Sequence, residues 1–243
     1  MKNLRTKHDL KEAIKKIKNL GFVPTMGSIH DGHISLIKKS KRVCNKTLVS
    51  IYVNPKQFNS KKDFSKYPRN IAKDLKILKK LKVNFVFTPS TKEIFKEKKI
   101  KKIILPNNQK ILCARFRKGH FEGVLDVMDR FIKLINPNYT FMGEKDFQQL
   151  FLVNKFIGKK YKNKIYSCKT VRDKNFLALS SRNFLLSKNE FNKAGLIAKY
   201  LSKLKSSLKK NNEDQNDILI KKKELQKKFN IKIDYLEIRN EKN

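Results

Sequence analysis

The chain has few cysteines and no long apolar segment. Its three cysteines, Cys44, Cys113 and Cys168, are far apart in 243 residues and form no C-x-x-C pair. This pattern excludes a C-x-x-C redox motif and fits reduced thiols in a cytoplasmic protein. No apolar run is long enough to cross a membrane, and the N-terminal residues lack the apolar stretch of a signal peptide. We therefore expect a cytoplasmic protein with no membrane partner.

Acidic residues are scarce. The chain has 21 Asp and Glu against 59 Lys and Arg, which gives a net charge of +38. Such a charge suggests nucleic-acid binding. However, the lysines are spread over nearly every polar position and form no single patch or arm, and abundant Asn and Ile suggest a bias toward AT-rich codons. We expect non-specific attraction to phosphates at low salt and no specific nucleic-acid partner.

Histidines are also few, and two of the four lie in one motif at residues 23–33, V-P-T-M-G-S-I-H-D-G-H. An apolar strand pattern precedes this motif, and a helix with lysines on its polar face follows it. The motif therefore lies where a strand ends and a helix begins, which is where open α/β sheets bind ligands. Helix N-termini offer free N–H groups that suit phosphate. His30 and His33, three residues apart, face the same side of such a turn.

Two other interpretations of the His-x-x-His pair remain open. The histidines could be ordinary surface residues, or they could be half of a metal site. No cysteine or cluster of carboxylates lies nearby to complete a zinc shell. Short motifs have a high false-positive rate, so this one needs support from the rest of the chain.

Strand and helix patterns alternate along the first three quarters of the chain. They predict a doubly wound α/β domain with a parallel sheet, because uncharged β-branched runs such as residues 47–53 suit strands buried on both faces. After residue 187 we expect two lysine-rich helices and one strand, with a domain boundary near residues 172–187. The expected helices are 6–19, 34 onward, 69–81, 121–135, one carrying Gln148 and Gln149, 188–210 and 213–229. The expected strands are 21–23, 47–53, 83–87, a possible edge strand at 103–105, 139–142, 163–170 and 231–238.

Six motifs in order resemble the pantoate–β-alanine ligase family. They are P-T-M-G with H-x-G-H at residues 24–33, V-N-P-K-Q-F at 53–58, Y-P-R at 67–69, R-x-G-H-F-x-G-V at 117–124, G-E-K-D-F-Q-Q at 143–149 and L-S-S-R-N at 179–183. Any one of these motifs is suggestive. Six of them in the right order are highly specific.

The resemblance implies a fold and a reaction. The fold is a Rossmann-like nucleotidyltransferase domain at residues 1–178 and a small, reduced α+β lid domain at residues 179–243. The reaction is the condensation of (R)-pantoate with β-alanine to pantothenate, a precursor of coenzyme A. It consumes ATP, requires Mg²⁺ as a cofactor, proceeds through pantoyl adenylate and releases AMP and pyrophosphate. The resemblance also implies a homodimer.

The same resemblance assigns roles to individual residues. His33 is the expected proton donor, and His30, Lys145 and Arg182 complete the catalytic set. Gln57 and Gln149 are expected to bind pantoate and β-alanine. The expected ATP-binding residues are Met26, Gly27, Ser28, Ile29, His30, Asp31, Gly32, His33, Gly143, Glu144, Lys145, Asp146, Val171, Leu179, Ser180, Ser181 and Arg182.

Two residues of the six motifs, His120 and Met26, also have a structural interpretation. A structural role for His120 is about as well supported as ligand contact. Met26 follows a strand, where a methionine is more often core than pocket. For the chain as a whole, another nucleotidyltransferase and a nucleic-acid-binding protein on a degenerate synthetase fold are the alternatives. The paired glutamine loops argue against the first, and the retained His30, His33, Lys145 and Arg182 argue against the second.

The chain also departs from the family pattern. Asp74 is preceded by Lys73 where many members have a second carboxylate, so Asp74 is the remaining candidate for a Mg²⁺ contact. Lys118 stands where proline is usual, and Phe176 stands where glycine is usual. Residues 112–114 read L-C-A in place of L-E-G. The sequence stops at Asn243, before further strands that relatives have, so we expect a reduced second domain or a fragment.

Overall fold

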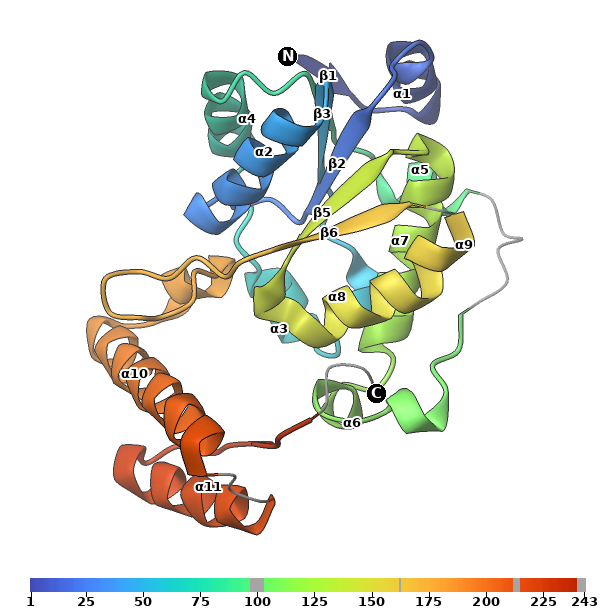
Figure 1. Cartoon of the computed structure of the whole chain (residues 1–243). Coiled ribbons are helices and arrows are strands. Elements are labelled where there is room, and N and C mark those ends of the chain that lie inside the picture. Colours follow the sequence, from blue (N-terminus) through green and yellow to red (C-terminus); the bar gives the residue numbers. More distant parts are fainter. Residues whose placement is uncertain (97–102, 162, 212–214, 240–243) are drawn as a thin grey trace.

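A six-stranded parallel sheet forms the centre of the structure. The computed structural model describes residues 1–96, 103–161, 163–211 and 215–239. The strands lie in the order β1-β4-β3-β2-β5-β6, and every neighbouring pair is parallel (Figure 1). Their bounds are β1 (Lys2–Leu4), β2 (Leu20–Thr25), β3 (Lys46–Ile51), β4 (Phe85–Phe87), β5 (Tyr139–Gly143) and β6 (Lys164–Cys168).

Alternating side chains give the sheet a core on each face. Phe22 on β2 is in register with Leu48 on β3, and both are fully buried on one face. The next pair along the strands, Val23 and Val49, is fully buried on the other face. Successive side chains of a strand point to opposite faces, so both faces need covering helices.

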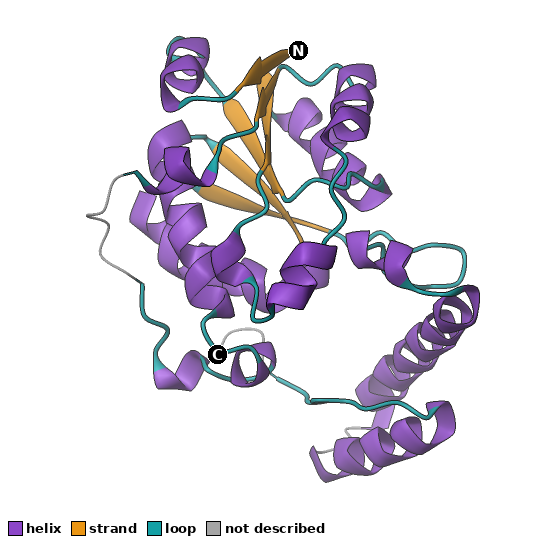
Figure 2. Ribbon diagram, turned by 180° about the vertical axis from the view of Figure 1, so that it is seen from behind, coloured by secondary structure: helices purple, strands orange, loops and turns teal. Residues whose placement is uncertain are grey.

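Helices cover both faces (Figures 1 and 2). One face packs against α2 (Asp31–Val43) and α4 (Ile71–Lys80) through apolar residues that include Ile37 and Leu78. The other face packs against α1 (Lys7–Ile14), α5 (Thr91–Phe95), α7 (His120–Ile135) and α8 (Phe147–Val153). The most deeply buried helix is α7, whose Leu125 and Ile132 lie against the sheet. The α/β prediction is therefore confirmed.

The direction of chain progression reverses between β2 and β5. From β2 the chain adds β3 and β4 on one side, and β5 and β6 then extend the sheet from the other side of β2. In open α/β sheets, ligands bind at the carboxyl ends of the strands at such a reversal. The stretch that follows β2 begins at Met26, and the stretch that follows β5 begins at Glu144. Both predicted nucleotide motifs therefore start at this point.

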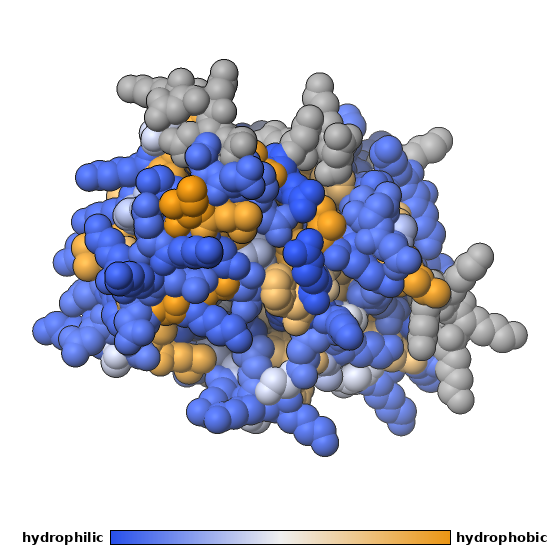
Figure 3. All heavy atoms as spheres, turned by 90° about the horizontal axis from the view of Figure 1, so that it is seen from below, coloured by the Kyte–Doolittle hydropathy of each residue, from blue (hydrophilic) through white to orange (hydrophobic). Residues whose placement is uncertain are grey.

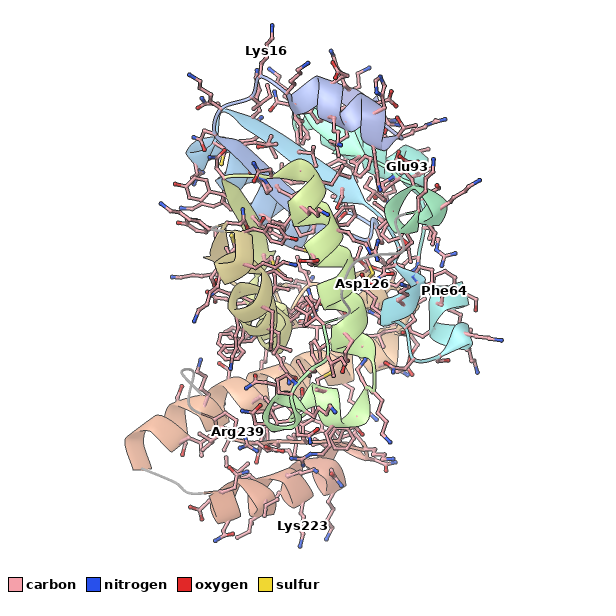
Figure 4. All side chains as sticks on the ribbon, turned by 90° about the vertical axis from the view of Figure 1, so that its right-hand side faces the viewer. Lys16, Phe64, Glu93, Asp126, Lys223 and Arg239 are labelled. Carbon is pink, nitrogen blue, oxygen red and sulfur yellow. The ribbon has the colours of Figure 1, made fainter. Side chains whose placement is uncertain are left out.

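The last part of the described chain is a helical arm. It consists of α10 (Lys188–Asn211) and α11 (Gln215–Phe229), and Tyr200 and Phe229 pack edge to face with ring centroids 6.3 Å apart. The segment after α11 returns to α6 (Cys113–Phe116), where Tyr235 stacks on Phe116 at a centroid distance of 5.9 Å. Figure 4 shows this returning segment, with Arg239 labelled, between α11 and α6.

Two predicted strands do not form, and one strand was not predicted. No strand forms at 103–105, where Leu105 is buried but Ile104 is 76% exposed. The sheet edge beside β4 is instead occupied by β1, a short strand that the sequence analysis missed. No strand forms at 231–238 either, so the described part of the expected α+β lid domain contains helices and irregular segments but no strand. In each segment a single residue, Leu105 or Tyr235, packs against the rest of the protein, and no neighbouring strand pairs with the segment.

Helix boundaries also differ from expectation. A capping box of Thr6 and Asp9 begins α1, which ends at Ile14 and not near residue 19 as expected. The backbone of Asn19 has a φ of 57°, and its side chain donates to the Val43 carbonyl, which ends any helix before β2. In α4, the apolar Ile71 is 48% exposed, whereas the charged Asp74 is buried. The domain boundary at residues 178 and 179 stays a prediction.

The face of the molecule seen from below is mostly hydrophilic. Hydrophilic residues cover most of this face, and apolar areas are small and separated (Figure 3). No helix in the described part of the chain is long and apolar enough to span a membrane.

Candidate active site

A cavity lies at the carboxyl ends of β2, β3 and β5. Its volume is about 240 Å³. Apart from the metal candidate Asp74, five predicted site residues do not line it, namely Gly27, Ser28, Ile29, Asp31 and Glu144. The structure brings together the other predicted residues along its wall, namely Met26, His30, Gly32, His33, Gln57, Gly143, Lys145, Asp146, Gln149, Val171, Leu179, Ser180, Ser181 and Arg182.

The two histidines of the motif are held as hydrogen-bond donors. His30 caps α2, and its Nδ1 accepts the backbone N–H of Gly32 at 3.1 Å. The Nδ1 of His33 accepts the backbone N–H of His30 at 3.4 Å. An atom that accepts an N–H carries no proton, so the neutral form of each ring has its proton on Nε2. The backbone therefore fixes both tautomers and leaves two Nε2–H donors.

Burial and positive charge keep these rings neutral. Desolvation in the cleft lowers the pKa of His33 to about 3, and His30 and Lys145 act in the same direction. Desolvation also lowers the pKa of His30, again with help from Lys145. The ring centroids are 4.0 Å apart, a spacing that disfavours two imidazolium ions. Gly32 fits beside this pair because a Cβ there would come to 2.8 Å from the His30 ring.

Asp74 fixes the backbone of the loop before α2. Its Oδ2 accepts the backbone N–H of Ser28, and its Oδ1 accepts that of Ile29, both at 2.8 Å. The residue is 2% exposed. These contacts give Asp74 a structural role and occupy one lone pair of each carboxylate oxygen. No group of three or more His, Cys, Asp or Glu side chains suited to a metal ion occurs among the described residues.

The loop carrying Gln57 is fixed to α7. Asn54 donates to the carbonyl of Gly123 at 3.0 Å and to the Gln57 amide oxygen at 3.3 Å. The Gln57 amide donates to the sulfur of Met26, and His120 Nδ1 lies 2.6 Å from the Gln57 carbonyl oxygen. A carbonyl can only accept, so His120 donates from Nδ1. The structure thus gives His120 a holding role in addition to its place in the cavity wall.

Charged groups line the opposite wall. Lys145, in the short helix Glu144–Asp146 after β5, forms an ion pair with Asp146 at 2.9 Å.

Of the two adjacent glutamines in α8, Gln149 lines the cavity, whereas Gln148 donates to the carbonyl of Ile111 at 2.8 Å. Glu144 points elsewhere and accepts the hydroxyl of Ser167.

The Leu179–Arg182 stretch closes the cavity from the side. Ser181 donates its hydroxyl to the Ser28 carbonyl at 3.2 Å, which joins this loop to the histidine loop. Tyr67 also hydrogen-bonds Ser181, and burial raises the pKa of its phenol. Tyr67 was not among the predicted site residues, although it lines the cavity. Its place in the Y-P-R motif could have indicated this position.

The inner end of the cavity is apolar, and none of its lining residues was among the predicted site residues. Its lining residues come from α7 and β5 and are Val124, Val127, Met128, Phe131 and Met142. The four positions on α7 follow helix periodicity, which predicts a buried face of the helix. Core and pocket give the same pattern in sequence, so only the packing distinguishes them.

Comparisons with known proteins agree with this geometry. A family model described as pantoate-beta-alanine ligase matches residues 2–243. A pantothenate synthetase from Leptospira biflexa is 41% identical over 95% of this chain and 84% of its own length. One from Clostridium botulinum is 39% identical over 98% of this chain and 87% of its own length.

Solved structures are similar over nearly the same span. A pantoate-beta-alanine ligase from Francisella tularensis, complexed with beta-gamma ATP and beta-alanine, has a TM-score of 0.83 at 34% identity, with 95% of this chain and 85% of that chain covered. A pantothenate synthetase from Thermus thermophilus has a TM-score of 0.84 at 29% identity, with 94% of this chain and 83% of that chain covered.

Proposed function

The chain belongs to the pantoate–β-alanine ligase family, and we propose that its cavity carries out both half-reactions of the family. The activity is the ATP-dependent condensation of pantoate with β-alanine to pantothenate. In the proposed first step, a pantoate carboxylate oxygen attacks the α-phosphorus of ATP. The bond to the bridging oxygen breaks, and pyrophosphate leaves. The amine of β-alanine then attacks the acyl carbon of pantoyl adenylate and displaces AMP.

The observation that carries this proposal is the pair of Nε2–H donors at the start of α2. Negative charge builds on the leaving pyrophosphate, and neutral donors at a helix N-terminus stabilise such charge without competing for a proton. We assign His33 as the donor nearest the leaving group and His30 as its companion. Lys145 adds a mobile positive charge, and Arg182 adds a planar fork that suits phosphate oxygens.

We assign the glutamine loops and the apolar inner end to the acid substrate. Gln57 and Gln149 reach the cavity from different elements, and an amide can both donate and accept hydrogen bonds. Pantoate combines a hydrocarbon centre with hydroxyls and a carboxylate. Amides beside the apolar wall of α7 suit that combination, and they add no charge that would compete with ATP.

Magnesium enters this proposal as part of the substrate Mg²⁺–ATP. We propose that the protein supplies few of the metal ligands, because Asp74 already accepts the backbone N–H groups of Ser28 and Ile29 and no group of three or more potential ligands occurs among the described residues. Phosphate oxygens and water commonly supply most ligands of Mg²⁺ at such sites. No step of the mechanism is assigned to a protein-bound metal.

Compartment and assembly also stay proposals. The three cysteines are free thiols, which supports the cytoplasmic assignment. We propose a homodimer, as the family resemblance implies, and sedimentation equilibrium at micromolar concentration tests it. The lid role of residues 179–243 is proposed on the contact of Ser181 with Ser28.

Pantoate-dependent exchange of pyrophosphate into ATP tests the function directly. We expect exchange with ATP and pantoate, none without pantoate, and pantothenate with AMP once β-alanine is added. If the exchange rate does not depend on pantoate but increases with another carboxylic acid, that acid is the substrate. No exchange by folded protein with any acid would disprove adenylation.

A further inference from the structure

Arg182 is held by a carboxylate on the far side of its guanidinium group. Asp63, in α3 (Lys61–Lys66), accepts from Nε at 3.2 Å and from Nη2 at 2.9 Å. The two residues are 119 positions apart in sequence, so the pair joins two separate segments of the site. Arg182 lines the cavity, whereas Asp63 is not among the lining residues. The carboxylate therefore lies behind the guanidinium as seen from the cavity.

Aromatic rings fix the plane of the same guanidinium. Its central carbon lies 5.3 Å from the ring centroid of Tyr67 and 5.8 Å from that of Phe58. Phe58 in turn packs edge to face against Tyr67 and against Phe64, which Figure 4 labels on α3. Cation–π contact and the side-on ion pair together define both the plane and the rotation of the group.

The Asp63 contact leaves a usable edge on Arg182. A guanidinium carries five N–H donors in a rigid fork. The side-on pair uses Nε–H and one N–H of Nη2, so the edge formed by Nη1 and the rest of Nη2 is left. That edge has the spacing to bind two oxygens of one phosphate.

We propose that Asp63 is a positioning residue that presents the free edge of Arg182 to the triphosphate. This inference rests on the proposed function, since it takes ATP as the ligand. Asp63 itself touches no substrate. Ser60 supports it, because the Ser60 hydroxyl accepts the backbone N–H groups of Lys62 and Asp63 and fixes the first turn of α3.

A double-mutant cycle on ATP binding tests this inference. The variants are Asp63→Asn, Arg182→Lys and the two combined, with ATP affinity measured by calorimetry and the KM values from pantoate-dependent exchange. We expect Asp63→Asn to raise the Kd and KM for ATP roughly three- to tenfold, the range for a partly exposed pair. The KM for pantoate should stay unchanged. Asp63→Glu should recover part of the loss.

The combined variant separates positioning from a general effect of charge. Lysine has no fork to orient, so Asp63→Asn should cost nothing further in the Arg182→Lys background. Glu224→Gln is the matched control, because it removes a carboxylate from the exposed pair with Lys221 on α11. We expect this control to bind ATP as the wild type does.

Three outcomes overturn the inference. They are ATP binding by Asp63→Asn within twofold of wild type, tighter binding, which would make Asp63 a competitor of phosphate, and an equal loss in the Arg182→Lys background. Calorimetry needs no turnover, so this test is separate from that of the proposed function. If the wild type binds ATP but shows no exchange, only the proposed function is contradicted. If the wild type does not bind ATP, both the proposed function and the positioning role of Asp63 are contradicted.

Discussion

The side-chain amide of Asn54 donates a hydrogen bond to the backbone carbonyl of Gly123 at 3.0 Å. The contact holds the loop of Gln57 against α7, where the backbone of Lys56 approaches Gly123 closely. A Cβ on Gly123 would overlap the carbonyl oxygen of Lys56. Lys56 also pairs with Asp126 on α7 at 3.0 Å, and Figure 4 labels Asp126 on this helix. The position of Gln57 therefore depends on a glycine in a distant helix.

Gly123→Ala should separate acid binding from ATP binding. Alanine favours the helix by about 1 kcal/mol, so α7 itself is not weakened. The new methyl group must instead displace the Lys56–Gln57 backbone. We expect the KM for pantoate to rise about tenfold or more while the ATP affinity stays within twofold of wild type. Kinetics and calorimetry measure the two, and Glu122→Ala on the same helix is the control. Equal losses for both ligands would contradict the assignment of Gln57.

Asp74→Asn should weaken ATP binding in a way that magnesium does not restore. An asparagine offers one acceptor oxygen where two backbone N–H groups need one each, and its amide N–H faces the second donor. The expected loss of stability is about 1–3 kcal/mol. Titration of ATP at low and high Mg²⁺ measures the effect. Asp9→Asn, which also removes a carboxylate from a backbone N–H, is the control on α1. Rescue by excess Mg²⁺ would restore the metal-ligand assignment.

His33→Ala should remove most pantoate-dependent exchange and leave the fold intact. Loss of one donor to developing charge typically lowers the rate about a hundredfold or more. Initial rates of exchange, with circular dichroism as the folding check, measure this. His8→Ala on the exposed side of α1 should exchange at the wild-type rate. Near-normal exchange by a folded His33→Ala variant removes His33 from the mechanism.

The lowered histidine pKa values predict acid-labile folding. His33 has a pKa of about 3 in the folded chain and an ordinary value of 6.5. Between these values the unfolded chain binds a proton that the folded chain does not. Stability is therefore fully present above pH 6.5 and falls as the pH decreases, by at most about 1.4 kcal/mol per pH unit for this group.

Urea unfolding at about pH 7.5, 6 and 5 measures this pH dependence. His33→Gln should lose less stability over that range than wild type, with His8→Gln as the control. His30 and His120 have pKa values lowered by burial too, so a residual slope of the same sign should persist. Parallel curves for wild type and His33→Gln would show that His33 does not titrate as described.

The adjacent glutamines of α8 offer an internal comparison. Gln149 lines the cavity, whereas Gln148 bonds to the Ile111 carbonyl outside it. Gln149→Ala should raise the KM for pantoate, because groups of the bound acid lose a partner worth about 1–3 kcal/mol in a dry site. Gln148→Ala should change stability but not that KM. The opposite pattern would exchange their roles, and loss of ATP affinity by Gln149→Ala would contradict its assignment to the acid.

The sequence predicts the parts of this structure that local patterns specify. Periodicity predicts α7 and the buried strands, and the six motifs indicate the residues that line the cavity. The role of Asp74 depends on a contact with residues 45 and 46 positions away, which no local pattern contains. The tautomers of His30 and His33 depend on the directions of backbone N–H groups. The segments 103–105 and 231–238 have strand-like patterns but lack neighbouring strands, and pairing is a property of the whole fold.

The stacking of Tyr235 on Phe116 has a mechanical consequence. In the described part of the chain, residues 172–187 connect the arm of α10 and α11 to the sheet domain at one end, and this ring pair adds a contact beyond the other end. The connecting segment contains Arg182, which lines the cavity. A rigid-body movement of the arm would therefore displace part of the cavity wall, and the ring pair restrains such a movement.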